Sequence, residues 1–232
     1  MDEKIISNTL TGLVEGFMAR TRFFRVWQEE AVGVPMSKKF LVSFDSLVRS
    51  FPSLIAAGAA RAQDEKTRMV LAVNLYQESG EGDLRRTHHA IYRKYLATAG
   101  INISMVPEEG FAVQWRKDLL QYINGVSQAP AALGALAAGE FLAQPVLSRI
   151  YPVLQTLYPG ADQEYFTKHL DLETEHVREI TELLAGQVSE EKEWAGVLEG
   201  FKFGLSVWES YFGNLAEFLT QDKDFGTMTN AD

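Results

Sequence analysis

Residues 165–176 read Tyr-Phe-Thr-Lys-His-Leu-Asp-Leu-Glu-Thr-Glu-His, and they predict the helix around which the whole chain is organised. Apolar residues recur at helical spacing within and after this stretch: Leu170, Val177, Ile180, Leu183 and Leu184. His169, Glu173 and His176 share one face of that helix, because they are four and three residues apart. Two imidazoles and a carboxylate on one face are a partial ligand set for iron, manganese or zinc. The alternative is a solvated face, since further glutamates flank the triplet.

Length and charge limit the classes of protein to which the chain can belong. Its 232 residues suit one large domain with a substantial core. The net charge of −9 argues against a surface for nucleic acid or an anionic membrane. No apolar run reaches the roughly 18 residues of a spanning helix, and acids stand near the N-terminus where a signal peptide has bases. We therefore expect a cytoplasmic protein without nucleic-acid or membrane partners.

The chain contains no cysteine. This excludes disulfides, thiolate metal sites and a cysteine nucleophile. Histidine, aspartate and glutamate remain as strong metal ligands, and the four histidines are His88, His89, His169 and His176.

Helical periodicity covers nearly the whole chain, and we find no strand alternation, nucleotide-binding glycine motif or internal repeat. Helices are predicted at about 2–31, 37–51, 54–62, 64–78, 84–99, 107–125, 129–144, 162–186 and 189–220, with a break or kink at Phe51-Pro52-Ser53 between the second and third of these ranges. Short connections favour antiparallel neighbours. We expect one all-α domain over residues 1–221, followed by a polar tail at 222–232.

Glu140 is the only ionisable residue in the small, apolar segment 129–144. A carboxylate buried there must be paired, protonated or bound to a cation. The simplest alternative to a metal is a helix cap or an ion pair with Arg149.

A second candidate ligand pair lies where a helix is interrupted by glycines at positions 80 and 82. Glu81 and His88 are seven residues apart and would share a face of an unbroken helix. Glu78 and His88 are ten apart and would meet only if the glycines break the helix. His88 and His89 point about 100° apart, so at most one of them faces a common pocket.

Together these residues offer three carboxylates and three imidazoles on three or four helices. Helical bundles build carboxylate-rich dinuclear sites from such residues. Oxygen and imidazole ligands without sulfur suit iron or manganese.

At these residues the chain resembles the haem-oxygenase-like diiron oxidases, a helical superfamily that includes the TenA, PqqC and CADD-like proteins. The likeness runs from about residue 51 to 176. The family pattern, an Asn-Leu-x-x-Glu-x-Gly-x-Gly stretch with a later His, a Glu on another helix and a His-x3-Asp-x2-His triplet, falls on Asn74, Leu75, Glu78, Gly80, Gly82, His88, Glu140, His169, Glu173 and His176. Two positions depart from it: Gln77 stands where relatives often have Glu, and Glu173 replaces the usual Asp.

The resemblance implies a haem-oxygenase-like bundle of about seven to eight helices and a particular set of ligands. The metal ligands would be Glu78, His88, Glu140, His169, Glu173 and His176, with Glu81 as second choice for the first position. The cofactor would be two iron ions per chain, with manganese as the alternative, and O2 would be the co-substrate. The substrate would be a small amino-acid-like or fatty-acid-like molecule that undergoes N-oxygenation, C–C cleavage or desaturation.

Three other activities of the superfamily fit the sequence less well. No histidine precedes His88 to serve as the proximal ligand of a haem oxygenase, and no cysteine is present for a TenA-type thiaminase. The CADD-like route to p-aminobenzoate, which is thought to consume a tyrosine and use a lysine, is disfavoured. No tyrosine precedes Tyr76, and Arg149 is the only basic residue between Lys117 and Lys168.

The substrate pocket is less well defined by the sequence than the metal site. Candidate pocket walls are Phe24, Trp27, Phe44, Leu136 and Phe141, and candidate carboxylate anchors are Arg85, Arg86 and Arg149. The other functions considered are a metal-free PqqC-like oxidase and a non-catalytic helical interaction protein. The chain could also form a homodimer and could use an external electron donor.

Overall fold

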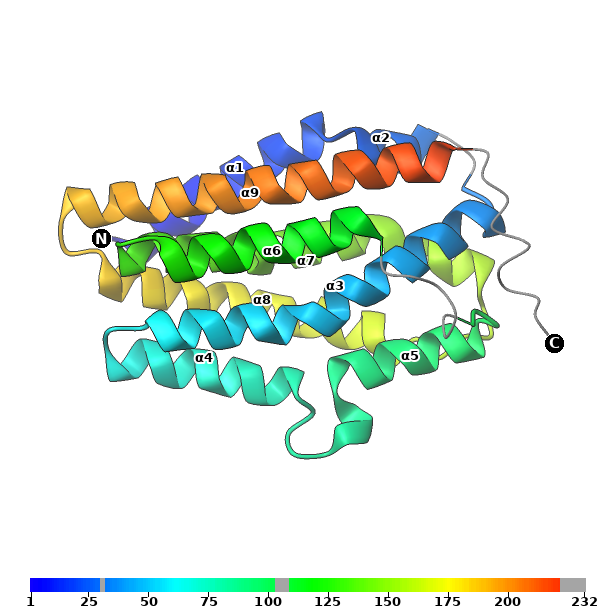
Figure 1. Ribbon diagram of the computed structural model, residues 1–232, viewed down its shortest axis with the longest axis horizontal. Coiled ribbons are helices and arrows are strands. Elements are labelled where there is room, and N and C mark those ends of the chain that lie inside the picture. Colours follow the sequence, from blue (N-terminus) through cyan, green and yellow to red (C-terminus); the bar gives the residue numbers. More distant parts are fainter. Residues whose placement is uncertain (30–31, 103–108, 222–232) are drawn as a thin grey trace.

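The computed structural model describes residues 1–29, 32–102 and 109–221, without the side chains of residue 29 and of residues 172–174. Within these ranges the chain is all-α (Figure 1). Its elements are α1 (Glu3–Arg20), α2 (Arg22–Glu29), α3 (Val34–Arg61), α4 (Glu65–Glu78), the short 3-10 helix η1 (Leu84–Arg86), α5 (His88–Thr98), α6 (Gly110–Gly125), α7 (Ala129–Leu157), α8 (Glu164–Gln187) and α9 (Glu191–Thr220). The predicted tail at 222–232 and the predicted helix start near residue 107 lie outside the described ranges.

Helix α7 is the centre of the bundle, and its most extensive packing is against α9 and α8. It approaches α9 closely because small residues face each other along the contact. A Cβ on Gly200 of α9 would overlap the carbonyl of Ala131, and a Cβ on Gly134 of α7 would overlap that of Val197. The segment predicted to be buried on all sides is buried as expected, from Ala131 to Leu142.

The all-α fold class is confirmed, but the helices are divided differently from the prediction. The described residues hold nine α-helices and one 3-10 helix, more than the seven to eight that the resemblance implies. The predicted first helix is divided at Thr21, which adopts an extended conformation and donates its hydroxyl to the Phe17 carbonyl.

The helix predicted at 129–144 continues beyond its expected end to form α7, and the ranges predicted at 37–51 and 54–62 form one helix, α3. Pro52 lies inside α3, and Pro145 and Pro152 lie inside α7. A proline removes one backbone donor, and packing of a long apolar helix against several neighbours can offset that cost. In Figure 1, α3 changes direction partway along and continues as one helix. Of the break or kink expected at Phe51-Pro52-Ser53, the structure therefore has the kink.

Contrary to the expectation from the sequence, two helices, α3 and α7, are long and apolar enough to cross a membrane by length and composition alone. Of the apolar 18-residue stretch in each helix, 78% is buried inside the bundle in α7 and 61% in α3. Burial of this extent is what the core helices of a helical domain show.

The turn between α4 and α5 has an unusual backbone. Gly80, Glu81 and Gly82 all have positive φ, at 79°, 56° and 91°. A Cβ on Gly80 would overlap the backbone of Asp83 and Thr87, so this position needs glycine for both conformation and space. In Figure 1 the turn loops out to one side of the bundle, and α5 then continues in roughly the direction of α4. The end of α4 at Glu78 therefore lies close to the start of α5 at His88.

Candidate metal centre

Three buried side chains from three helices converge at the core of this site. Glu78 is the last residue of α4, His88 is the first residue of α5, and His169 lies in α8. One ligand atom from each lies within 4.8 Å of the other two. The two imidazole rings are 4.4 Å apart between centroids. Each side chain is at most 8% exposed, so this charged and polar group is taken out of water.

The contact between Glu78 and His88 has the separation of two metal ligands rather than the geometry of a hydrogen bond. Glu78 Oε1 lies 2.8 Å from His88 Nδ1. Even so, neither ring nitrogen of His88 has a hydrogen-bond partner in the described part of the chain. Two ligands about 2.1 Å from one ion and at right angles to each other would be separated by about 3 Å. Side chains that aim at a common point rather than at each other fit a metal ion.

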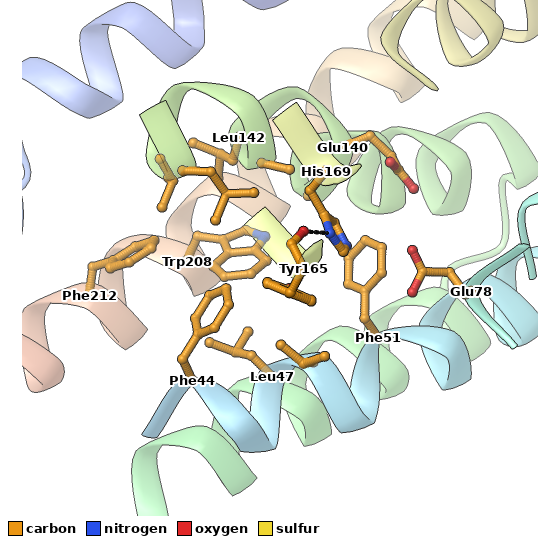
Figure 2. A pocket seen from close by; sticks show the side chains of 15 residues that line it. Phe44, Leu47, Phe51, Glu78, Glu140, Leu142, Tyr165, His169, Trp208 and Phe212 are labelled. Carbon is orange, nitrogen blue, oxygen red and sulfur yellow. Dashed lines mark hydrogen bonds between the residues drawn. The ribbon is translucent and has the colours of Figure 1, made fainter. Parts of the chain in front are cut away.

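His169 is fixed in the orientation that a ligand needs. Its Nδ1 donates to the carbonyl oxygen of Tyr165 at 2.6 Å (Figure 2), which leaves Nε2 as the atom with a lone pair. Metal-binding histidines are commonly held in this way. Burial, and then the neighbouring His88, lower the pKa of His169 to about 4, so the ring is neutral near pH 7.

Glu140 and His176 form a second group beside the first. Glu140 lies on α7, and its Oε2 is 3.5 Å from Nδ1 of His176 on α8. Its other oxygen, Oε1, accepts a hydrogen bond of 3.1 Å from Nδ2 of Asn74 on α4. Figure 2 shows the carboxylates of Glu78 and Glu140 and the ring of His169 facing the same space.

The remaining predicted ligands fall in two different places. The backbone of Glu173 lies in α8 between His169 and His176, and its side chain lies outside the described residues. The side chain of Glu81, the second choice, is 48% exposed and lies 3.9 Å from Arg86. The structure therefore brings Glu78, not Glu81, to the other candidate ligands. His89 faces away from them and lies 3.0 Å from Asp45.

An apolar cavity of about 80 Å³ opens beside the candidate ligands. Its wall comes from α3, α4, α7, α8 and α9 (Figure 2). It is lined by Phe44, Leu47, Val48, Phe51, Glu78, Gly139, Glu140, Leu142, Ala143, Val146, Leu147, Tyr165, His169, Trp208 and Phe212.

Of the predicted pocket residues, only Phe44 lines this cavity. Phe24 and Trp27 pack in an aromatic cluster with Phe23, and Phe141 packs against Phe201. Leu136 is buried in the core and does not line this cavity.

The candidate arginine anchors also lie away from the cavity. Arg149 lies over the ring of Phe24 at 5.5 Å. Arg85 pairs with Asp83, and Arg86 lies near Glu81, both on the exposed turn.

Several cavity residues were missed by the sequence reasoning. Tyr165 could have been found, because it lies four residues before His169 and so on the same helical face; their rings are 4.1 Å apart. Trp208 and Phe212 reach the cavity from α9, and nothing in their spacing separates them from ordinary core aromatics. The contact between Asn74 and Glu140 joins residues 66 positions apart and has no local signal.

A buried cluster of glutamates and histidines inside a helical bundle is typical of metal-binding helical proteins. The sequence matches the family described as iron-containing redox enzymes over residues 38–209. The match covers most of the chain, and the protein belongs to this family. No curated protein matches the sequence.

Solved structures confirm the haem-oxygenase-like fold that the sequence suggested. A CADD-like protein of unknown function from Nostoc punctiforme matches with a TM-score of 0.77 and 16% identity, over 94% of this chain and 100% of that one. A domain with a haem-oxygenase-like fold from Shewanella denitrificans matches with a TM-score of 0.71 and 13% identity, over 94% and 93%. A TenA homologue from Pseudomonas syringae matches with a TM-score of 0.68 and 11% identity, over 93% of both chains.

Proposed function

We propose that this protein is a non-haem diiron oxidase that uses O2 to oxidise a small, largely apolar substrate. The observation that carries the proposal is the convergence of Glu78, His88 and His169, whose ligand atoms lie within 4.8 Å of one another in a buried site. Glu140 and His176 lie beside them and, with Glu173 of the family pattern, would complete the positions for a second ion. Manganese is the alternative metal, since the same oxygen and nitrogen ligands suit it.

Iron bound at this site would supply the redox chemistry towards O2. The protein's own residues prepare the site for it. The Tyr165 carbonyl keeps the Nε2 lone pair of His169 available. Burial keeps His169 neutral, so no proton has to leave that ring near pH 7 when a metal binds. Mostly apolar side chains line the cavity where the substrate would lie, and such a lining disfavours water.

The lining of the cavity favours a fatty-acid-like substrate over a free amino acid. Its ionisable groups at the metal end are Glu78, Glu140 and His169, and no lysine or arginine of the described residues lines it. A free amino acid carries two charges, and a charge buried without a partner is costly. An alkyl chain along Phe44, Leu147 and Phe212 would instead gain from burial, with its polar end next to the metals.

Three further features belong to the proposal. The protein would act on a small molecule in the cytoplasm, without nucleic-acid or membrane partners, in keeping with its net charge of −9. An external electron donor would reduce the irons where the reaction consumes more electrons than the substrate provides. A homodimer is the proposed assembly.

Metal content is the direct test of this proposal. The protein is loaded with Fe(II) without oxygen, freed of excess metal and analysed for iron, alongside the variants His169→Ala and Glu140→Ala. We expect about two irons per native chain and fewer in both variants. His89→Ala is the matched control, because it removes a neighbouring imidazole that faces Asp45, and it should keep the native iron content.

Oxygen consumption by the loaded protein then tests the choice of substrate. A panel of medium-chain fatty acids and free amino acids is compared, and we expect the fatty acids to accelerate O2 uptake. A native protein without iron would overturn the diiron proposal and favour a metal-free PqqC-like oxidase or a non-catalytic interaction protein. Faster uptake with amino acids alone would overturn the choice of substrate and leave the metal centre standing.

A further inference from the structure

Asn74 is a buried amide that directly contacts one of the candidate ligands. It lies on the inner face of α4, one turn before Glu78, and is 4% exposed. Its Nδ2 lies 3.1 Å from Glu140 Oε1 on α7. The contact joins the helix that ends at the first group of ligands to the helix that provides the second group.

The chemistry of the contact fixes the orientation of the amide. An ionised carboxylate only accepts hydrogen bonds, so the NH2 of Asn74, rather than its carbonyl, must face Glu140. A hydrogen bond to a buried carboxylate is charge-assisted and therefore stronger than one between neutral groups. Asn74 thus holds Glu140 Oε1 and stabilises its charge where water does not reach it.

The two carboxylate oxygens of Glu140 have different partners. Oε1 is engaged by Asn74, whereas Oε2 faces His176 at 3.5 Å. An oxygen that already accepts a strong hydrogen bond is a poorer donor to a metal than its neighbour. The oxygen left for a metal is therefore Oε2, on the side of the carboxylate where His176 lies.

We propose that Asn74 is a positioning residue for the second metal ion: it holds Glu140 Oε1 so that Oε2 and His176 together present a site to that ion. This inference rests on the proposed diiron function. Asn74 does not contact the ion itself and acts through Glu140 alone. The first ion, at Glu78, His88 and His169, should bind independently of it.

The test is a titration of the full-length, metal-free protein with Mn(II) under anaerobic conditions. Unbound Mn(II) is counted by electron paramagnetic resonance, which gives the affinities of both ions without any enzymatic activity. Asn74→Leu keeps a similar volume and removes the N–H donor. Its matched control is Gln77→Leu on the same helix, which also removes an amide but not one that contacts Glu140. Thermal unfolding of each metal-free variant shows that it is folded.

We expect Asn74→Leu to weaken the second ion by about 10- to 100-fold, the usual effect of losing a group that orients a metal ligand. The first ion should lose less affinity than the second, because the hydrogen bond of Asn74 goes to Glu140 and not to a ligand of the first ion. Gln77→Leu should bind both ions as the native protein does.

A double-mutant cycle separates positioning from general loss of structure. If Asn74 acts through Glu140, then Asn74→Leu should have no further effect on the second ion once Glu140→Gln is present. Full additivity of the two substitutions would overturn the inference, as would native affinity for both ions in Asn74→Leu or an equal loss of both. In each of these cases the diiron proposal survives. A native protein that binds one ion or none would overturn both.

Discussion

The two halves of the metal centre are prepared to different degrees. Glu78, His88 and His169 lie within 4.8 Å of one another, and His88 has no hydrogen-bond partner in the described part of the chain. Glu140 instead has one oxygen bonded to Asn74 and the other 3.5 Å from His176. The first half is arranged by the backbone, through a turn and two helix ends. The second is arranged by a side chain, so the two halves should respond differently to mutation.

The largest effect is expected at the first half, and it distinguishes Glu78 from Glu81. Glu78→Gln should weaken the first ion by more than about 100-fold, because losing a ligand exceeds the effect of losing an outer partner. Glu81→Gln removes a half-exposed carboxylate near Arg86 and should leave both ions unchanged. Mn(II) titration followed by electron paramagnetic resonance measures this. A larger loss in Glu81→Gln would show that the turn rearranges when metal binds.

Acid should destabilise the metal-free protein through His169. Its pKa is about 4 when folded and about 6.5 when unfolded, so the unfolded chain takes up the proton first. The free energy of unfolding should fall as the pH drops from about 6.5 to about 4, by up to about 3 kcal/mol. Urea unfolding across this range measures the fall. His169→Gln, which does not titrate, should show a shallower fall, and equal slopes would refute the assignment.

The turn that sets up the first half can be tested at Gly80. Gly80→Ala should destabilise the protein by about 2 kcal/mol or more, because a positive φ and a clash with the backbone act together. It should also weaken binding of the first ion, since the clash involves the backbone of Thr87, directly before His88.

Gly100 provides the control for that variant. It has a similar φ of 73°, and nothing lies within 4 Å of an added Cβ. Gly100→Ala should therefore cost only about 1 kcal/mol. Urea unfolding of both variants isolates the clash, and equal destabilisation would mean that the turn has room to relax.

The smallest effect is expected at Gly139, which precedes Glu140 and lines the cavity. A Cβ there would lie 3.0 Å from the ring of Phe51, which must shift slightly to accept it. Gly139→Ala should weaken binding of a medium-chain fatty acid by roughly 4-fold, the equivalent of one displaced methylene. Both metal affinities should stay native. Calorimetric titration of the anaerobic, metal-loaded protein measures the fatty acid, and a loss of metal instead would show that the second half tolerates no change on α7.

The all-α fold class could be predicted from the sequence because it depends on local periodicity, and the full set of candidate ligands was implied by the family resemblance. Helical spacing placed His169 and His176 on one face, and the isolation of Glu140 in an apolar segment marked it as unusual. The spacing alone did not decide between Glu78 and Glu81, since that choice depends on three consecutive positive φ values in the turn. The end of α7 was predicted too early, at residue 144, because a proline follows there. Packing against neighbouring helices outweighs the cost of a proline inside the helix. The cavity wall required contacts between distant segments.

The length of the turn at residues 79–87 determines whether Glu78 and His88 can reach the same metal site. Surface turns usually tolerate insertions and deletions well. Here one residue more or less would shift the start of α5 relative to the end of α4, because Gly80 packs directly against the backbone of Asp83 and Thr87. His88 would then leave the site, although every residue of the ligand set would still be present in the sequence. Among relatives, an alignment gap at this turn would therefore mark a change of metal site as reliably as the substitution of a ligand.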